Sequence, residues 1–185
     1  MKWINSTGGP SIIIATAKVK KWSGIGTIEA ALKNEFEETE DFMDPNQCHY
    51  GQACEIINEI GLVKIQGSTT EVIIIGDEPL QMTVLGNAEK TGIIIVKWSF
   101  GENVETVESF LDFNELEVLP NWQALMTAQL HSDEHILLDA AASGFDLEKD
   151  EIIKFELKKG TYAISSLTFS PNEKTEMYLY QFKRK

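Results

Sequence analysis

The residues best suited to chemistry are His131-Ser132-Asp133-Glu134-His135, which have the spacing H-x-x-E-H. In one class of zinc peptidases this spacing places two imidazoles and a general base on one face of a helix. That chemistry needs a helix, so that the two histidines, four residues apart, point the same way. Here the five residues lie between two stretches of alternating apolar residues, so the pattern favours a polar turn with a hairpin tip at Ser132-Asp133. A zinc hydrolase built on His131, Glu134 and His135 stays open as an alternative hypothesis.

The adjacent carboxylates Asp77 and Glu78 are a second candidate for acid and base chemistry. Neighbouring side chains on an extended chain point to opposite faces, whereas paired catalytic carboxylates converge on one substrate. Asp77 also stands two residues before Pro79, which favours an Asx-type turn. We therefore interpret the pair as turn-forming residues.

The remaining motifs offer little material for catalysis. The chain contains no G-x-S-x-G elbow, Walker loop or G-x-G-x-x-G, and Gly24-Ile25-Gly26 is too short for a phosphate-binding loop. Cys48 and Cys54 lie six residues apart with no second pair, which indicates reduced thiols, with Cys54 in the core, better than a disulfide framework or a zinc site. We expect no catalytic residue, no metal and no cofactor.

A chain of 185 residues is long enough to bury a core without disulfides or metals. We expect a single domain, 1–185, with tightly packed halves of about 1–112 and about 113–185. The apolar run Ile12 to Ile14 is too short for a secretory signal or a membrane span. The prediction is a soluble cytoplasmic protein with no membrane partner.

The formal charge of −13 is unevenly distributed along the chain. Residues 29–151 hold 26 acidic residues against 5 basic ones, whereas residues 1–28 and 152–185 are each at +4. A negative field of this size repels nucleic acid, and Arg184 is the only arginine. The charge fits either plain solubility or a basic protein partner.

Two apolar runs are expected to form the centre of the sheet that positions everything else. Val72–Ile75 and Ile93–Val96 are rich in β-branched residues and flank the turn at 76–79, as strands buried on both faces do. Four strands with short connections are predicted, and an antiparallel meander is their economical topology. Their expected ranges are 62–65, 71–75, 80–85 and 91–100. On the last strand Lys97 is expected to reach the rim.

The helix signals are clearest after Asp44, which can cap a helix whose first residue is Pro45. This helix is expected to run to about Ile60 and to end at Gly61, with His49 exposed or half exposed. Its predicted apolar face is Tyr50, Ala53, Cys54, Ile57 and Ile60. Shorter helices are predicted around residues 30–32 and over 103–112, the second with an acidic outer face.

The stretch 122–130 is ambiguous between strand and helix: its Ala, Leu, Met and Gln residues favour a helix, but its alternating apolar residues predict a strand, with Leu125 as the exception. Further strands are predicted over 136–141, 152–157, 161–169 and 176–182, which together are typical of a small β-sandwich or curled sheet. The predicted fold class is α+β: mainly an antiparallel β meander plus a β-sandwich-like C-terminal half, with two or three short helices.

Several short motifs occur together in this chain. They are residues 3–10 before an apolar strand, Trp22-Ser23-Gly24, the helix with Tyr50 and Cys54, Gly76-Asp77-Glu78-Pro79, and Val96-Lys97-Trp98. This pattern resembles the immunity protein 21 family of bacterial polymorphic toxin systems over most of residues 1–100. The second half resembles it more loosely, through residues 137–139 and 159–162. Lys97 stands where the family pattern has Arg, which weakens any bidentate carboxylate contact there. The residues that carry the resemblance as scaffold are Trp3, Gly8, Gly9, Pro10, Gly76, Asp77, Glu78, Pro79 and Trp98.

The resemblance implies a non-enzymatic protein that binds a cognate toxin domain, blocks its active or functional surface, and protects the producing cell or its kin. An acidic protein of this kind suits a basic toxin surface. The alternative is a non-catalytic β-rich module for a small ligand or peptide, and the oligomeric state stays open. The interface candidates are Glu35, Phe36, Glu37, Glu38, Glu102, Glu105 and Glu108.

Overall fold

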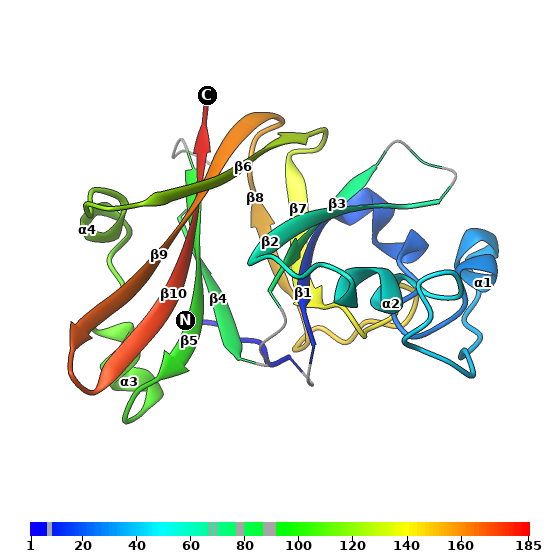
Figure 1. Cartoon of the computed structure of the whole chain (residues 1–185), viewed down its shortest axis with the longest axis horizontal. Coiled ribbons are helices and arrows are strands. Elements are labelled where there is room, and N and C mark those ends of the chain that lie inside the picture. The colour runs from blue at the N-terminus through cyan, green and yellow to red at the C-terminus, as the bar shows by residue number, and fades with distance from the viewer. Residues whose placement is uncertain (7–8, 67, 69, 77–79, 87–91) are drawn as a thin grey trace. The chain divides into compact units, whose positions relative to one another are not determined.

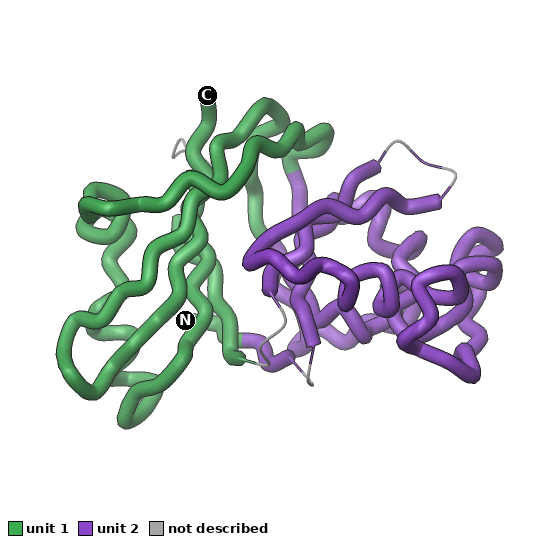
Figure 2. Tube along the Cα trace, in the orientation of Figure 1, with its two compact units in different colours: residues 1–3, 80–133, 155–185 green, residues 4–79, 134–154 purple. Residues whose placement is uncertain are grey.

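A computed structural model describes residues 1–6, 9–66, 68, 70–76, 80–86 and 92–185. These residues form ten strands in two antiparallel sheets and five short helices (Figure 1). The predicted α+β class, mostly β, is confirmed, with five helices in place of two or three. The chain divides into two compact units that alternate along the sequence (Figure 2). Unit 1 is Met1–Trp3, Leu80–Asp133 and Phe155–Lys185, and unit 2 is Ile4–Pro79 and Glu134–Lys154.

The sheet of unit 2 has the order β2-β3-β1-β7-β8, and β8 runs on into unit 1 at Phe155. Strand β1 is central because it pairs antiparallel with β3 on one side, Ile12 opposite Ile74, and with β7 on the other, Ile13 opposite Leu137. The runs of isoleucine in β1 and β3 are buried on both faces, as their composition predicts. The strands are β1 Ser11–Ala15, β2 Ile60–Lys64, β3 Glu71–Ile75, β7 Glu134–Asp139 and β8 Ile153–Glu156.

The sheet of unit 1 has the order β4-β5-β10-β9-β6. Its long central strands pair antiparallel, with Leu179 of β10 opposite Val96 of β5 and Leu167 of β9. One face carries a core cluster that includes Ile94, Val96 and Leu179. The strands are β4 Gln81–Leu85, β5 Gly92–Phe100, β6 Gln123–Leu130, β9 Gly160–Asn172 and β10 Thr175–Arg184.

The strands at 60–100 all form where the sequence predicts them, but they do not make one meander. β2 pairs with β3 and β4 pairs with β5, and these two hairpins belong to different sheets. The two isoleucine-rich runs therefore lie in separate sheets, and the predicted turn at residues 77–79 lies outside the described residues. An apolar run indicates a central strand with a neighbouring strand at each edge, but it does not specify which strands these neighbours are. The remote strands β1 and β10 take those places.

The strands of the C-terminal half are also divided between the sheets, with β7 and β8 in one and β9, β10 and β6 in the other. They do not form a sandwich of their own. Each compact unit thus combines segments from both predicted halves, 1–112 and 113–185. The single-domain organisation itself stays a prediction.

The helix predicted from Pro45 to Ile60 is much shorter in the structure. Helix α2 is His49–Cys54, and the thiol of Cys48 caps it by accepting a hydrogen bond from the Gly51 amide at 3.3 Å. Asp44 accepts the Asn46 amide at 2.9 Å instead, so the capping signal closes a turn. Downstream, Gly61 lies inside β2 and ends no helix, and Ile57 is fully exposed. Of the predicted apolar face, Ala53 and Ile60 are buried, while Tyr50 and Cys54 are only half-buried.

The other helices are single turns or little more. The short helix expected around residues 30–32 is α1 Ile28–Lys33, which Thr27 caps and which ends at Asn34 with a positive φ of 60°. The helix expected over 103–112 is α3 Val104–Glu108, capped by the Asn103 side chain. Two further helices are η1 Thr16–Lys21 and α4 Phe113–Glu117.

The ambiguous stretch 122–130 is strand β6, as the alternation predicts. Its pairing with β9 shifts register between Ala124 and Met126, so Leu125 breaks the alternation because a β-bulge lies there. Lys97, expected at the rim of β5, is only 3% exposed. The strand stays buried one residue longer than its apolar run indicates.

Candidate functional site

Residues 29–44, here called the acidic segment, carry seven acidic residues and one lysine and form the most strongly charged stretch of unit 2. Hydrogen bonds between the residues that precede and follow it close it at its base. The Ser23 amide donates to His49 Nδ1 at 3.0 Å, and the His49 amide donates to Ser23 Oγ at 2.9 Å. The Tyr50 amide donates to the Gly24 carbonyl at 3.0 Å. The segment therefore leaves and rejoins the unit at one fixed point.

His49 anchors this base and is buried, which corrects the expectation that it is exposed or half exposed. Helix α2 begins at His49 instead of Pro45, so the helical periodicity expected from Pro45 does not set the direction of the His49 side chain. Its ring stacks on the buried Trp22 with centroids 4.9 Å apart. Because Nδ1 accepts the Ser23 amide, the neutral ring carries its proton on Nε2, which has no hydrogen-bond partner among the described residues. Burial lowers the pKa of His49 to about 4, so the ring is neutral at neutral pH and its role is structural.

The middle of the acidic segment is pinned to the chain that precedes α1. The Thr27 amide donates to the Glu37 carbonyl at 2.7 Å, and the Thr39 amide donates to the Ile25 carbonyl at 3.3 Å. With the backbone held in this way, the predicted interface residues Glu35, Glu37 and Glu38 are all exposed. Within the described residues their carboxylates make no hydrogen bond or ion pair. Their carboxylates therefore face solvent, and Lys33, which pairs with Glu29 at 2.7 Å, attracts Glu35 and Glu37 only at longer range.

Three large apolar side chains stand exposed among these acids. Phe36, a predicted interface residue, is 46% exposed, and Phe42 and Met43, which the sequence reasoning missed, are 52% and 53% exposed. The Phe36 ring lies over Gly26, where an added Cβ would come within 2.8 Å of the ring carbons. The signal that could have found Phe42 and Met43 is their position between two turn-forming aspartates.

Hydrogen bonds to Asp41 and from Cys48 fix the backbone of Phe42 and Met43. Asp41 accepts the Met43 amide at 3.0 Å, and Cys48 Sγ donates to the Phe42 carbonyl at 3.0 Å. The ring of Phe42 leans on Tyr50, with centroids 6.1 Å apart. The exposed apolar atoms are thus presented by a hydrogen-bonded turn.

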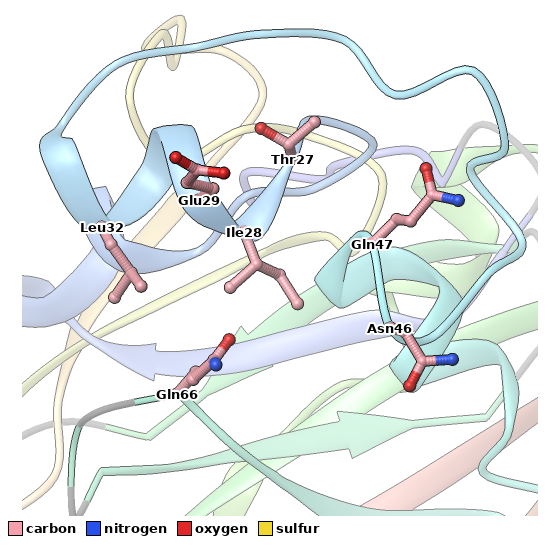
Figure 3. A pocket seen from close by; sticks show the side chains of 7 residues that line it. All are labelled: Thr27, Ile28, Glu29, Leu32, Asn46, Gln47 and Gln66. Carbon is pink, nitrogen blue, oxygen red and sulfur yellow. The ribbon is translucent and has the colours of Figure 1, made fainter.

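A pocket of about 450 Å³ opens beside the acidic segment (Figure 3). Ile28 and Leu32 project from α1 toward Gln66, while Gln47 is fixed because it accepts from the Thr39 hydroxyl at 2.6 Å and donates to Asp44 at 2.9 Å. The pocket therefore joins an aliphatic wall to amide groups. Its lining residues are Thr27, Ile28, Glu29, Leu32, Asn46, Gln47 and Gln66.

The predicted interface acids of unit 1 are placed differently. Glu108 of α3 accepts the N-terminal ammonium at 2.9 Å and the indole N–H of Trp3 at 2.9 Å, and these contacts hold the pKa of its carboxyl below the ordinary value. Glu102 pairs with Lys174 at 3.0 Å. Only Glu105 of this set is exposed without an ion pair among the described residues.

The residues of the family pattern are scaffold contacts where they are described. Trp3 and Trp98 pack edge to face with centroids 5.9 Å apart. Gly9 lies against Tyr50, whose hydroxyl would be 2.5 Å from an added Cβ. The buried Pro10 accepts the Ala140 amide through its carbonyl at 2.9 Å, and Gly76 donates to the Glu59 carbonyl at 2.8 Å. Gly8, Asp77, Glu78 and Pro79 lie outside the described residues.

The stretch 131–135 is a crossing between sheets, because β6 belongs to one sheet and β7 to the other. The hairpin tip expected at Ser132-Asp133 is therefore wrong. His131 is exposed, whereas His135 is buried in β7 opposite Ala15 of β1. Within the part of the chain that the structure describes, no group of three or more His, Cys, Asp or Glu side chains could hold a metal. No helix in that part is both long and apolar enough to cross a membrane.

The family model described as immunity protein 21 matches residues 2–175. No curated protein and no solved structure matches the chain.

Proposed function

The chain belongs to the immunity protein 21 family, and on that premise we propose that it binds a cognate bacterial toxin domain and neutralises it by blocking its active or functional surface. The proposal is of a non-catalytic binder that acts in the cytoplasm of the producing cell. The observation that carries it is the family match, which spans residues 2–175.

The surface chemistry supports a basic partner. The chain carries a formal charge of −13, and its acidic segment presents unpaired carboxylates to solvent. A concentrated negative surface attracts a positively charged protein and speeds encounter with it, an effect that salt weakens. Toxins that act on nucleic acid have positively charged surfaces, because they must hold phosphates.

Growth rescue tests the proposal directly. The toxin domain encoded beside this gene is expressed in a susceptible bacterium with and without the chain, and the two proteins are then co-purified. We expect growth to be restored and a one-to-one complex to elute as a single species. A matched control replaces the chain with an unrelated acidic protein of similar size, which is expected not to protect. Growth arrest that persists with the soluble chain present would refute the proposal.

A further inference from the structure

We propose that the acidic segment of unit 2, and not the acidic surface of α3 in unit 1, is the docking surface for a basic protein surface on the toxin. Phe36, Phe42 and Met43 are exposed apolar side chains that it offers to the partner. This inference rests on the proposed function and adds the location and chemistry of the contact.

The first argument is the exposure of apolar side chains. Phe36, Phe42 and Met43 lie within eight residues of one another, and each is about half exposed. Aromatic side chains and Met are enriched in protein interfaces, where a few buried anchors supply most of the binding energy. Val118 and Phe100 of unit 1 are exposed too, but they belong to different elements, and of the two only Val118 has an acidic neighbour in sequence, Glu117.

The second argument is the sign and availability of the charge. The carboxylates of Glu35, Glu37 and Glu38 flank Phe36 in sequence and make no ion pair within the described residues. A partner that covers Phe36 and Phe42 must bring compensating positive charge, because burying unpaired carboxylates is costly. At α3 and just before it, the charges of Glu108 and Glu102 are already neutralised by the N-terminal ammonium and Lys174.

The third argument is the pocket beside the segment. Ile28 and Leu32 offer an aliphatic wall, and Gln66 reaches toward it from the opposite side (Figure 3). Asn46 uses its side-chain N–H on Asp44, which leaves its amide oxygen as an acceptor. A lysine or arginine side chain fits such a site, since its stem packs on aliphatic groups while its charged head donates hydrogen bonds. The pocket thus suits the same basic partner as the acids.

The fourth argument is that the segment is already ordered. Hydrogen bonds between Ser23 and His49 close its base, and bonds to Ile25 and from Thr27 fix its middle. A surface that needs little ordering on association loses less entropy when it binds.

The test measures binding of the full chain to a catalytically inactive form of the toxin domain encoded beside its gene, by calorimetry. F42A/M43A removes two apolar anchors, and Val118→Ala truncates an apolar residue of unit 1 that is even more exposed. We expect F42A/M43A to weaken binding about 30-fold or more and Val118→Ala to change it less than about 3-fold. Thermal melts check that each variant is folded.

A second pair keeps the test decisive if F42A/M43A melts early. Glu37→Lys and Glu105→Lys make the same change in net charge at exposed carboxylates of the two units. Only Glu37→Lys is expected to weaken binding, by about 10-fold. Wild-type binding with unchanged affinity in F42A/M43A and Glu37→Lys would overturn the inference and leave the proposed function standing. Absence of wild-type binding and of growth rescue would overturn both.

Discussion

The acidic segment of unit 2 and helix α3 of unit 1 look equivalent in the sequence, because both place several glutamates within a few residues. The structure uses them in opposite ways. Glu108 of α3 forms an ion pair with the N-terminal ammonium and accepts a hydrogen bond from Trp3. Glu102, just before α3, forms an ion pair with Lys174, so these acids help to stabilise the unit. In the acidic segment Asp41 and Asp44 close turns and Glu29 pairs with Lys33, but the carboxylates of Glu35, Glu37 and Glu38 make no hydrogen bond or ion pair within the described residues. Acidic residues that form ion pairs within a unit have a different role from acidic residues that stay exposed to solvent.

The largest effect is expected at the base of the acidic segment. Trp22 is fully buried, donates to the Ala140 carbonyl at 2.9 Å and stacks on His49. Trp22→Ala leaves a cavity and an unpaired carbonyl, so we expect the free energy of unfolding to fall by about 3–5 kcal/mol. Urea denaturation measures it. Val118→Ala serves as the exposed control, and a loss for Trp22→Ala below about 1 kcal/mol would show that the base does not depend on this ring.

The second prediction concerns pH and the same base. His49 has a folded pKa of about 4 against an ordinary value of 6.5, so the unfolded state binds the proton first as pH falls. Its contribution is therefore intact above about pH 6.5 and is lost progressively down to about pH 4, by about 3 kcal/mol in all. Denaturation at a series of pH values compares the wild type with His49→Asn, which retains an acceptor near Nδ1.

We expect the stability difference between wild type and His49→Asn to shrink across that pH window. His131→Asn supplies the matched control, because it removes an exposed histidine from the other unit. A constant difference between wild type and His49→Asn from about pH 7.5 to about pH 4 would mean that His49 is not the titrating group.

The third prediction compares the two acidic surfaces in binding kinetics. E35K/E38K and E102K/E105K alter net charge equally, so any general effect of charge is the same for both. We expect E35K/E38K to lower the association rate with the toxin domain about 10-fold at low salt, and E102K/E105K to lower it less than about 3-fold. Stopped-flow measurements at two ionic strengths test this. Equal slowing by both double variants would make steering a property of total charge alone.

The smallest effect is expected from loss of the hydrogen bond between Trp3 and Glu108. Trp3→Phe keeps an aromatic ring beside Trp98 but removes the indole N–H that donates to Glu108 at 2.9 Å. Loss of one part-buried hydrogen bond is expected to cost about 1 kcal/mol, or about 2–4 °C in melting temperature. Toxin affinity is expected to stay unchanged. A variant that melts like wild type but binds the toxin more weakly would place this corner in the interface instead.

Local patterns predicted the elements well, because each rests on nearby residues. The isoleucine runs, the alternation over 122–130 and the caps at Thr27 and Asn103 all gave the right type of structure. The helix after Asp44 failed, since the same aspartate can cap a helix or close a turn, and only the packing of His49 against Trp22 shows which it does.

What the sequence by itself determined was the α+β class, the excess of acidic residues and the family pattern. Only the tertiary structure decided which strands share a sheet, since an apolar run states that it is buried without naming its partner. The tertiary structure also decided which carboxylates form ion pairs, because such pairs join residues as distant in sequence as Met1 and Glu108. The sequence gives the number of acidic residues, but long-range contacts decide which of their carboxylates remain free to bind a partner.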